Sequence, residues 1–123
     1  MRPEVRFHIR EGRRIAPLAI GPGKIALLEA IRDTGSITAA AKSLGMSYRR
    51  AWLLVEETNR CLVGPAVETA AGGQRGGGTV LTRVGSELIE RYRELERATE
   101  IAVKRDFRSM LRTLPPNPSG SRP

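Results

Sequence analysis

Apolar residues recur at every third or fourth position between residues 22 and 62, and this spacing predicts helices. Glycines at positions 35 and 45 interrupt the pattern and divide it into three helices, over residues 22–34, 37–44 and 48–62. Ser36 and Ser47 stand directly before the second and third helices, where serine is favoured because its hydroxyl accepts a backbone N–H bond. We expect the apolar side of the third helix to consist of Trp52, Leu54 and Val55.

Two short hairpins are predicted on either side of these helices. Residues 4–10 alternate between an apolar and a polar face, formed by Val5, Phe7 and Ile9 on one side and Arg6, His8 and Arg10 on the other. This period of two indicates a half-buried strand, and a turn at Glu11-Gly12 would bring residues 13–16 back as its partner, within a hairpin of residues 4–18. Farther along, residues 66–71 and 79–82 are β-prone and enclose a glycine-rich tip over residues 72–78.

A long amphipathic helix is predicted after Thr82, which can cap it, and extends to about residue 112. Its apolar positions alternate spacings of four and three, at Leu88, Tyr92, Leu95, Thr99 and Ala102. Such a seam suits an antiparallel or crossed pair of helices from two subunits. A helix of about 30 residues would extend roughly 45 Å, farther than a small domain can cover. We therefore favour dimerisation over packing of this helix on its own domain.

The order of elements is strand, strand, three helices, strand, strand and one long helix. Two short helices joined by a tight turn and followed by a hairpin are typical of a winged helix-turn-helix. We therefore predict a mainly α fold with small β-hairpins (α+β) in one domain over residues 1–112. Residues 66–82 would be its wing and residues 83–112 its dimerisation helix, and the proline-rich residues 113–123 are expected to form a disordered tail.

Composition excludes several classes of protein. The chain has 123 residues, 40% of them apolar, with no apolar run long enough for a membrane span and no signal-peptide pattern, so we expect a cytoplasmic protein without a membrane partner. Cys61 is the single cysteine and His8 the single histidine, which excludes an internal disulfide and a cysteine-based zinc site. We expect no metal, no cofactor and no enzyme activity.

Charge and local pattern together favour DNA as the partner. The formal net charge is +8, and arginine supplies 18 of the 21 cationic residues. Within residues 37–54, Ala41 is small enough for two helices to cross closely, and Gly45 four residues later tolerates the positive φ of a turn. The apolar residues expected to anchor the second helix of the pair inward are Leu44, Met46, Ala51 and Leu54. The first turn of the second helix of such a motif approaches base edges in the major groove, and arginine can fork onto guanine or grip phosphate there.

The candidate DNA-contacting residues follow from this geometry. Ser47, Tyr48, Arg49 and Arg50 lie at the start of the second helix of the motif, and Ser36, Thr38 and Lys42 are placed to contact the DNA backbone from the first. Arg75 is the charged residue of the glycine-rich tip. The tip lacks the Gly-Lys-Ser/Thr ending of a nucleotide-binding loop, so a wing near the minor groove and a mobile loop are the two interpretations that fit it.

These segments resemble a known family. Residues 35–41, Gly-Ser-Ile-Thr-Ala-Ala-Ala, residues 46–52, Met-Ser-Tyr-Arg-Arg-Ala-Trp, and the glycine-rich residues 72–82 are similar to the DNA-binding half of ModE-type molybdate-responsive transcriptional regulators. The first stretch is shared more loosely with LysR-type regulators. The resemblance covers residues 4–112 and implies a winged-helix domain that binds operator DNA as a homodimer. In that family separate C-terminal modules sense molybdate, and since no β-rich segment follows the last helix here, we expect that module to be absent.

The leading hypothesis is thus a dimeric transcriptional regulator that reads a near-palindromic double-stranded DNA site. Two alternatives stay open: a protein that responds to an oxyanion such as molybdate or another small ligand, and a dimeric protein–protein adaptor that has lost DNA binding. Among single residues, Trp52 is expected to pack in the core in preference to stacking on a base, Cys61 to be buried, and His8 to lie on the surface.

Overall fold

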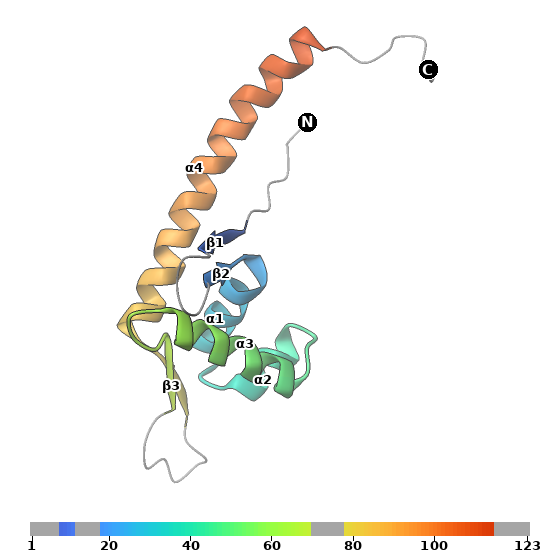
Figure 1. The fold of residues 1–123 in the computed structure, drawn as a ribbon. Helices are drawn as coiled ribbons and strands as arrows, with labels where there is room; N and C mark the ends of the chain where they lie inside the picture. The colour runs from blue at the N-terminus through green and yellow to red at the C-terminus, as the bar shows by residue number, and fades with distance from the viewer. Residues whose placement is uncertain (1–7, 12–17, 70–77, 115–123) are drawn as a thin grey trace.

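The computed structural model describes residues 8–11, 18–69 and 78–114, which form two small hairpins, three packed helices and one long helix (Figure 1). In chain order the elements are β1 (Ile9–Glu11), β2 (Leu18–Ile20), α1 (Pro22–Thr34), α2 (Ile37–Ser43), α3 (Tyr48–Cys61), β3 (Val67–Thr69), β4 (Thr79–Leu81) and α4 (Arg83–Thr113). This is the α+β winged-helix arrangement expected from the sequence.

The helices begin and end at the residues that the sequence indicates. Pro22 starts α1, where its missing N–H costs no helical hydrogen bond, and Gly35 ends it with φ of +71°. Ser36, Ser47 and Thr82 cap α2, α3 and α4, each accepting a backbone N–H bond through its side-chain oxygen. The predicted helix boundaries are therefore confirmed to within one or two residues.

The core lies where α1, α2, α3, α4 and the strand ends meet. The most fully buried large side chains come mainly from α1, whose Ile25, Leu27, Leu28 and Ile31 fill the centre as its apolar periodicity predicts. Small residues from α2 and α3 allow these helices to approach closely, and the other core members are Ile20, Ala40, Ala41, Ala51, Val55, Ala66, Val67, Ile89 and Tyr92.

The first hairpin differs from its prediction. β1 and β2 pair antiparallel with Ile9 opposite Ile20 and Glu11 opposite Leu18. Glu11, expected in the turn, therefore lies in a strand, and the return strand comes later than residues 13–16, which are outside the described residues. The burial of Ile20 explains the shift, because this residue anchors β2 in the core directly before α1 begins.

The second hairpin is hydrogen-bonded to the loop that follows α1. β3 and β4 pair antiparallel, with Val67 opposite Leu81. At the end of the ladder nearer the tip, the Thr79 N–H donates to the Gly35 carbonyl at 2.9 Å, and at the base of the hairpin the Thr82 N–H donates to the Ala66 carbonyl at 2.9 Å. The hairpin expected over residues 66–82 is thus present, while its tip, including Arg75, lies outside the described residues.

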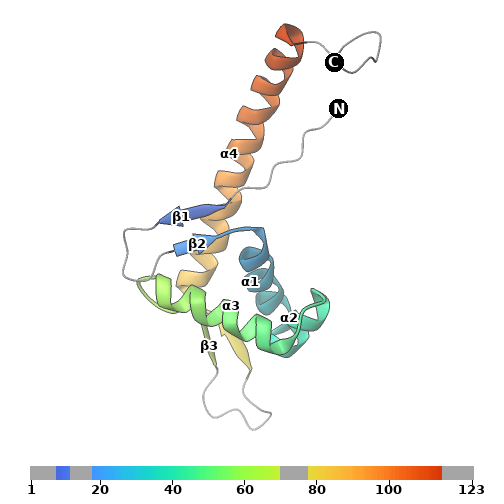
Figure 2. The ribbon, with the colours of Figure 1, turned by 45° about the vertical axis from the view of Figure 1, so that its right-hand side comes forward.

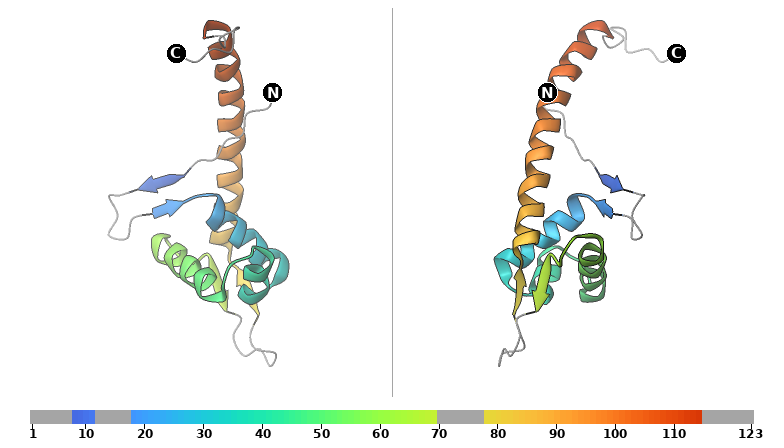
Figure 3. Two further views of the ribbon diagram at one scale, coloured as in Figure 1. Left: turned by 90° about the vertical axis from the view of Figure 1, so that its right-hand side faces the viewer. Right: turned by 60° about the vertical axis from the view of Figure 1, so that its left-hand side comes forward.

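The long helix α4 packs on the core only near its start. It has 31 residues and extends about 46 Å. Gly85, Ile89 and Tyr92 are its buried residues, and the rest of the helix projects away from the domain in every view (Figures 1, 2 and 3). No helix in the described part of the chain is long and apolar enough to cross a membrane.

Two members of the expected dimer seam pack within this chain's own domain. Leu88 is partly buried and packs against the core. Tyr92 has 1% of its surface exposed and belongs to this chain's own core, so it is not available to a second subunit. Burial and the nearby Glu96 raise the pKa of its phenol. The prediction was wrong because the core-facing and seam-facing positions of one helix share the same spacing, and only the packing of α1 against α4 separates them.

An ion-pair cluster holds α4 against α1. The Arg93 guanidinium pairs with Glu29 of α1 through two nitrogens and with Glu96 on its own helix at 2.7 Å. All three side chains are about one quarter to one third exposed. The hydrogen bond that Arg93 donates to the Glu29 carboxylate is the main reason that the pKa of Arg93 is raised, so this arginine stays charged wherever the fold persists.

Candidate nucleic-acid interface

The turn between α2 and α3 has the geometry of a helix-turn-helix. Gly45 occupies the turn with φ of +67°, a left-handed conformation that favours glycine. The Met46 N–H then donates to the Ala41 carbonyl at 3.0 Å, which closes the turn onto the end of α2. Ala41 is buried, as a close helix crossing requires. The two residues that identified the motif in the sequence therefore perform the structural roles expected of them.

The serine caps set the direction in which the second helix starts. The Ser47 hydroxyl accepts the Arg50 N–H at 3.1 Å, and the Ser36 hydroxyl accepts the Ala39 N–H at 3.1 Å. Both hydroxyls, predicted as DNA contacts, thus already serve as helix caps, although each retains its own proton for donation. The first turn of α3 is left with its remaining N–H groups facing outward, where they favour an anion.

The other predicted contact residues are exposed on α2 and α3. Thr38 and Lys42 lie one helical turn apart on α2, and Tyr48, Arg49 and Arg50 form the first turn of α3. Neither Arg49 nor Arg50 makes an ion pair with another described residue. Guanidinium groups that form no ion pair provide positive charge that suits a phosphate or a guanine edge.

Two shallow grooves adjoin this turn and share Arg50 and Leu54. One, of about 250 Å³, is lined by Ser47, Arg49, Arg50, Leu53, Leu54 and Glu57. The other, of about 240 Å³, also contains His8 and Arg10 from the first hairpin and Lys24 from α1. Its full lining is His8, Arg10, Gly21, Gly23, Lys24, Met46, Arg50 and Leu54. The positive surface thus extends from α3 toward β1, a continuation that the sequence pattern did not indicate. His8 is exposed, as expected.

Three apolar residues depart from their predicted places. Trp52 is 43% exposed and is not a core residue, because the buried face of α3 is formed by Ala51, Val55 and Thr58. Leu44, expected to anchor the second helix, is also exposed, while Cys61 is half-buried where full burial was expected. Met46, Ala51 and Leu54 do face or pack against the core.

Sequence reasoning missed Asn59, which joins α3 to the wing. Its side-chain oxygen accepts the Ala66 N–H at 2.8 Å and the Val67 N–H at 3.2 Å, and its Nδ2 donates to the Val67 carbonyl at 3.1 Å. One amide thereby fixes the end of α3 to the first residue of β3. A polar residue at helical spacing gives no such signal in a sequence, because its partners are backbone groups seven and eight residues later.

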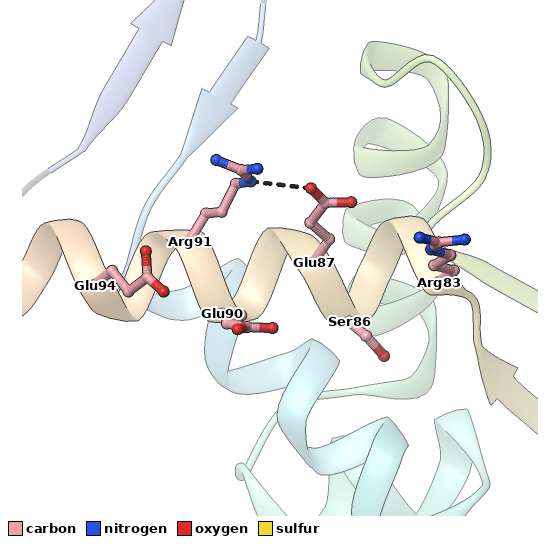
Figure 4. Close-up of a pocket in the computed structure, with 6 residues that line it drawn as sticks. All are labelled: Arg83, Ser86, Glu87, Glu90, Arg91 and Glu94. Carbon is pink, nitrogen blue, oxygen red and sulfur yellow. Dashed lines mark hydrogen bonds and ion pairs between the residues drawn. The ribbon is translucent and has the colours of Figure 1, made fainter.

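The outer face of α4 has a different character (Figure 4). Its side chains carry both charges: Arg91 reaches toward Glu87 at 3.0 Å, and the other residues along the same face are Arg83, Ser86, Glu90 and Glu94. The mixture of charges is typical of a solvated helix face and does not favour a polyanion. The described residues contain no cluster of histidine, cysteine, aspartate or glutamate that could hold a metal ion.

Comparison with known proteins finds relatives among molybdenum-related proteins. No protein-family model matches the chain. The chain is 48% identical over 77 residues to the molybdenum-pterin-binding protein MopB of Rhodobacter capsulatus, covering 63% of this chain and 28% of that protein. It is 46% identical over 71 residues to the DNA-binding transcriptional dual regulator ModE of Escherichia coli K12, which covers 58% of this chain and 27% of that protein. It is 41% identical over 85 residues to the transcriptional regulator ModE of Haemophilus influenzae, which covers 69% of this chain and 33% of that protein.

These similarities confirm the resemblance to ModE-type molybdenum-related regulators. The matched segments span about three tenths of the length of each of these relatives. The similarity therefore concerns one segment of these longer proteins, and their activities are considered for this chain only as proposals.

Proposed function

We propose that this protein is a non-catalytic, sequence-specific DNA-binding regulator of transcription that acts as a homodimer in the cytoplasm. One observation carries the proposal. A capped helix, α3, begins directly after a left-handed glycine turn and presents two exposed arginines that pair with no described residue. In a helix-turn-helix this helix lies in the major groove, so Arg49 and Arg50 would contact bases or phosphates there.

The first helix of the motif would position the protein on the DNA. Thr38 and Lys42 lie exposed on α2 beside the start of α3, and contacts from them and from Ser36 would fix the register of α3 without reading sequence. Arg10, on the groove that continues from Arg50, extends the positive surface toward β1. The proposed interface therefore combines phosphate contacts from several elements with base contacts from one helix.

We place the second subunit on the part of α4 that projects from the domain. Leu95 is half-exposed there, and Thr99 and Ala102 remain partly exposed, as a helix pair between subunits requires. The face that buries Ile89 and Tyr92 in the core continues along the helix as Val103, Phe107 and Met110, at spacings of three and four. A second copy packed on this seam would cover apolar surface that the chain's own domain cannot reach.

The direction of α4 constrains how two copies would pair. The helix leaves the domain on the side opposite to that toward which the β3–β4 hairpin points (Figures 1 and 2). If both subunits place α3 and the wing on one face of a duplex, both α4 helices run away from that duplex. This arrangement favours a side-by-side, crossed pair over an antiparallel one, and it would set two α3 helices roughly 34–36 Å apart on a near-palindrome.

The test is selection of duplexes from a pool of genomic fragments, followed by fluorescence anisotropy of the selected site at several salt concentrations, with and without molybdate. We expect a near-palindromic site whose affinity exceeds that of random duplex by at least about 10³. The logarithm of the binding constant should fall linearly with that of salt, since cationic side chains displace counterions from phosphates. Equal weak binding to all fragments would overturn the proposal and favour the adaptor. Molybdate binding without DNA binding would favour the oxyanion-responsive alternative.

A further inference from the structure

The exposed apolar side chains of α3 lie beside its arginines. Tyr48 is 53% exposed, Trp52 43% and Leu53 45%, on a helix of only 14 residues. Tyr48 and Trp52 are four residues apart, so they are neighbours on one side of the helix, and Arg49 and Leu53 are neighbours next to them. Large aromatic residues are costly to leave in water, and a group of them on one helix marks a contact surface.

The surroundings of this apolar group indicate what it contacts. The exposed Arg49 and Arg50 lie beside it at the start of α3, and Glu56, four residues after Trp52, is the acidic residue on its C-terminal side. The acidic Glu57 on the same helix is paired with Lys24 at 3.2 Å, so it contributes little net negative charge. An apolar group beside two exposed arginines complements a polyanion that itself carries apolar groups, more closely than it complements a neutral protein surface.

Double-stranded DNA offers one such apolar group in the major groove. The 5-methyl of thymine is the apolar feature of the base edges there, and cytosine presents an amino donor in the corresponding region. Resting on the DNA-binding function proposed above, we propose that Trp52, with Tyr48 beside it, packs against a thymine methyl and thereby selects thymine over cytosine at one position of each half-site. Arg49 and Arg50 would supply the polar contacts next to it.

Replacing thymines of the selected duplex one at a time by deoxyuridine, which lacks only the methyl, tests this contact. The wild-type chain should lose affinity about threefold to tenfold at one position per half-site, the effect of one buried methyl group. Trp52→Ala should bind the thymine and uracil duplexes equally at that position, because the residue that senses the methyl is gone. Trp52→Phe should keep part of the preference. Arg49→Ala is the matched control, since it should weaken binding and yet preserve the thymine-to-uracil ratio.

A second readout does not depend on affinity. Trp52 is the chain's single tryptophan, so its fluorescence reports this side chain alone. Quenching by acrylamide should fall at least about twofold when the specific duplex is added, because the ring becomes shielded from solvent. If the chain binds a specific duplex but the uracil effect is absent or persists in Trp52→Ala, the proposed contact is wrong while the DNA-binding function stands.

Two further outcomes separate the contact from the function. Shielding of Trp52 by a higher concentration of the chain without DNA would place this surface in a protein–protein contact and overturn the proposal. Failure of the wild-type chain to select any duplex would overturn the DNA-binding function itself, and the proposed thymine contact with it.

Discussion

At the scale of single residues, Gly85 is the position where the fold has least room for a side chain. A Cβ added there would lie 2.3 Å from the Ala66 carbonyl oxygen and 2.7 Å from Leu81 Cδ1. Backbone cannot yield as a flexible side chain does, so α4 would have to move away from the wing base. We expect Gly85→Ala to lower the free energy of unfolding by about 1–3 kcal/mol, measured by urea denaturation.

Gly23 is the matched control for this substitution. It also lies in a helix, but a Cβ there would meet nothing within 4 Å. Alanine favours helix over glycine, so Gly23→Ala should leave the free energy of unfolding unchanged or raise it by up to about 1 kcal/mol. Equal effects of the two substitutions would contradict the close approach of α4 to Ala66.

Arg49 and Arg50 can be distinguished by how their loss acts on different duplexes. An arginine that forks onto a guanine should cost about 1–3 kcal/mol of binding free energy on the specific site and relax specificity at one base pair when replaced by alanine. A phosphate contact should instead weaken binding to all sequences alike and make the salt dependence less steep. Anisotropy titrations of Arg49→Ala and Arg50→Ala against specific and random duplexes measure this difference. Unchanged affinity for both variants would remove the start of α3 from the interface.

At the scale of elements, the attachment of α4 to α1 depends on the pair of Arg93 and Glu29. Because this pair is partly buried and uses two guanidinium nitrogens, we expect a coupling of about 1 kcal/mol in a double-mutant cycle with Arg93→Gln and Glu29→Gln. Thermal unfolding of the four variants provides the measurement.

The exposed pair of Arg91 and Glu87 on the same helix serves as the control for that cycle. It lies on the outer face of α4 and is more than half exposed, so its coupling should be no more than about 0.5 kcal/mol. A larger coupling for this exposed pair would mean that burial does not decide the strength of these ion pairs.

The sequence allowed the helices, the helix-turn-helix and the second hairpin to be predicted because their signals are local. Gly35, Gly45 and the serine caps act on backbone within a few residues, so they can be recognised without knowledge of the fold. The first hairpin was placed too early, since its register depends on the burial of Ile20. Trp52 was placed in the core for a similar reason: apolar character does not reveal whether a helix face meets protein or solvent.

At the scale of the whole molecule, the projecting part of α4 is where dimerisation can be tested without disturbing the domain. Met110 and Ile101 are both exposed but nine residues apart, which is two and a half helical turns, so they face opposite sides. If the seam continues through Met110, Met110→Asp would bury a charge between the subunits and weaken the dimer at least about tenfold. Sedimentation velocity over a range of concentrations measures this.

Ile101→Asp introduces the same charge on the other side of the helix and should leave the dimer intact. Loss of the dimer in Ile101→Asp alone would move the seam to the opposite face of α4. A dimer that survives both substitutions would place subunit contact outside the projecting part of the helix.

The three hydrogen bonds of Asn59 have a consequence for how binding specificity can diverge. They fix the angle between α3 and the wing base through backbone groups of Ala66 and Val67, none of which belongs to the exposed surface of α3. The orientation of α3 is therefore set during folding. When the protein binds its target, α3 has little rotational freedom left to lose. Substitutions at the exposed positions 48–50, 52 and 53 can accordingly alter which bases are preferred while the angle of approach stays constant. Descendants of this chain could therefore acquire new target sites by changing a few exposed side chains.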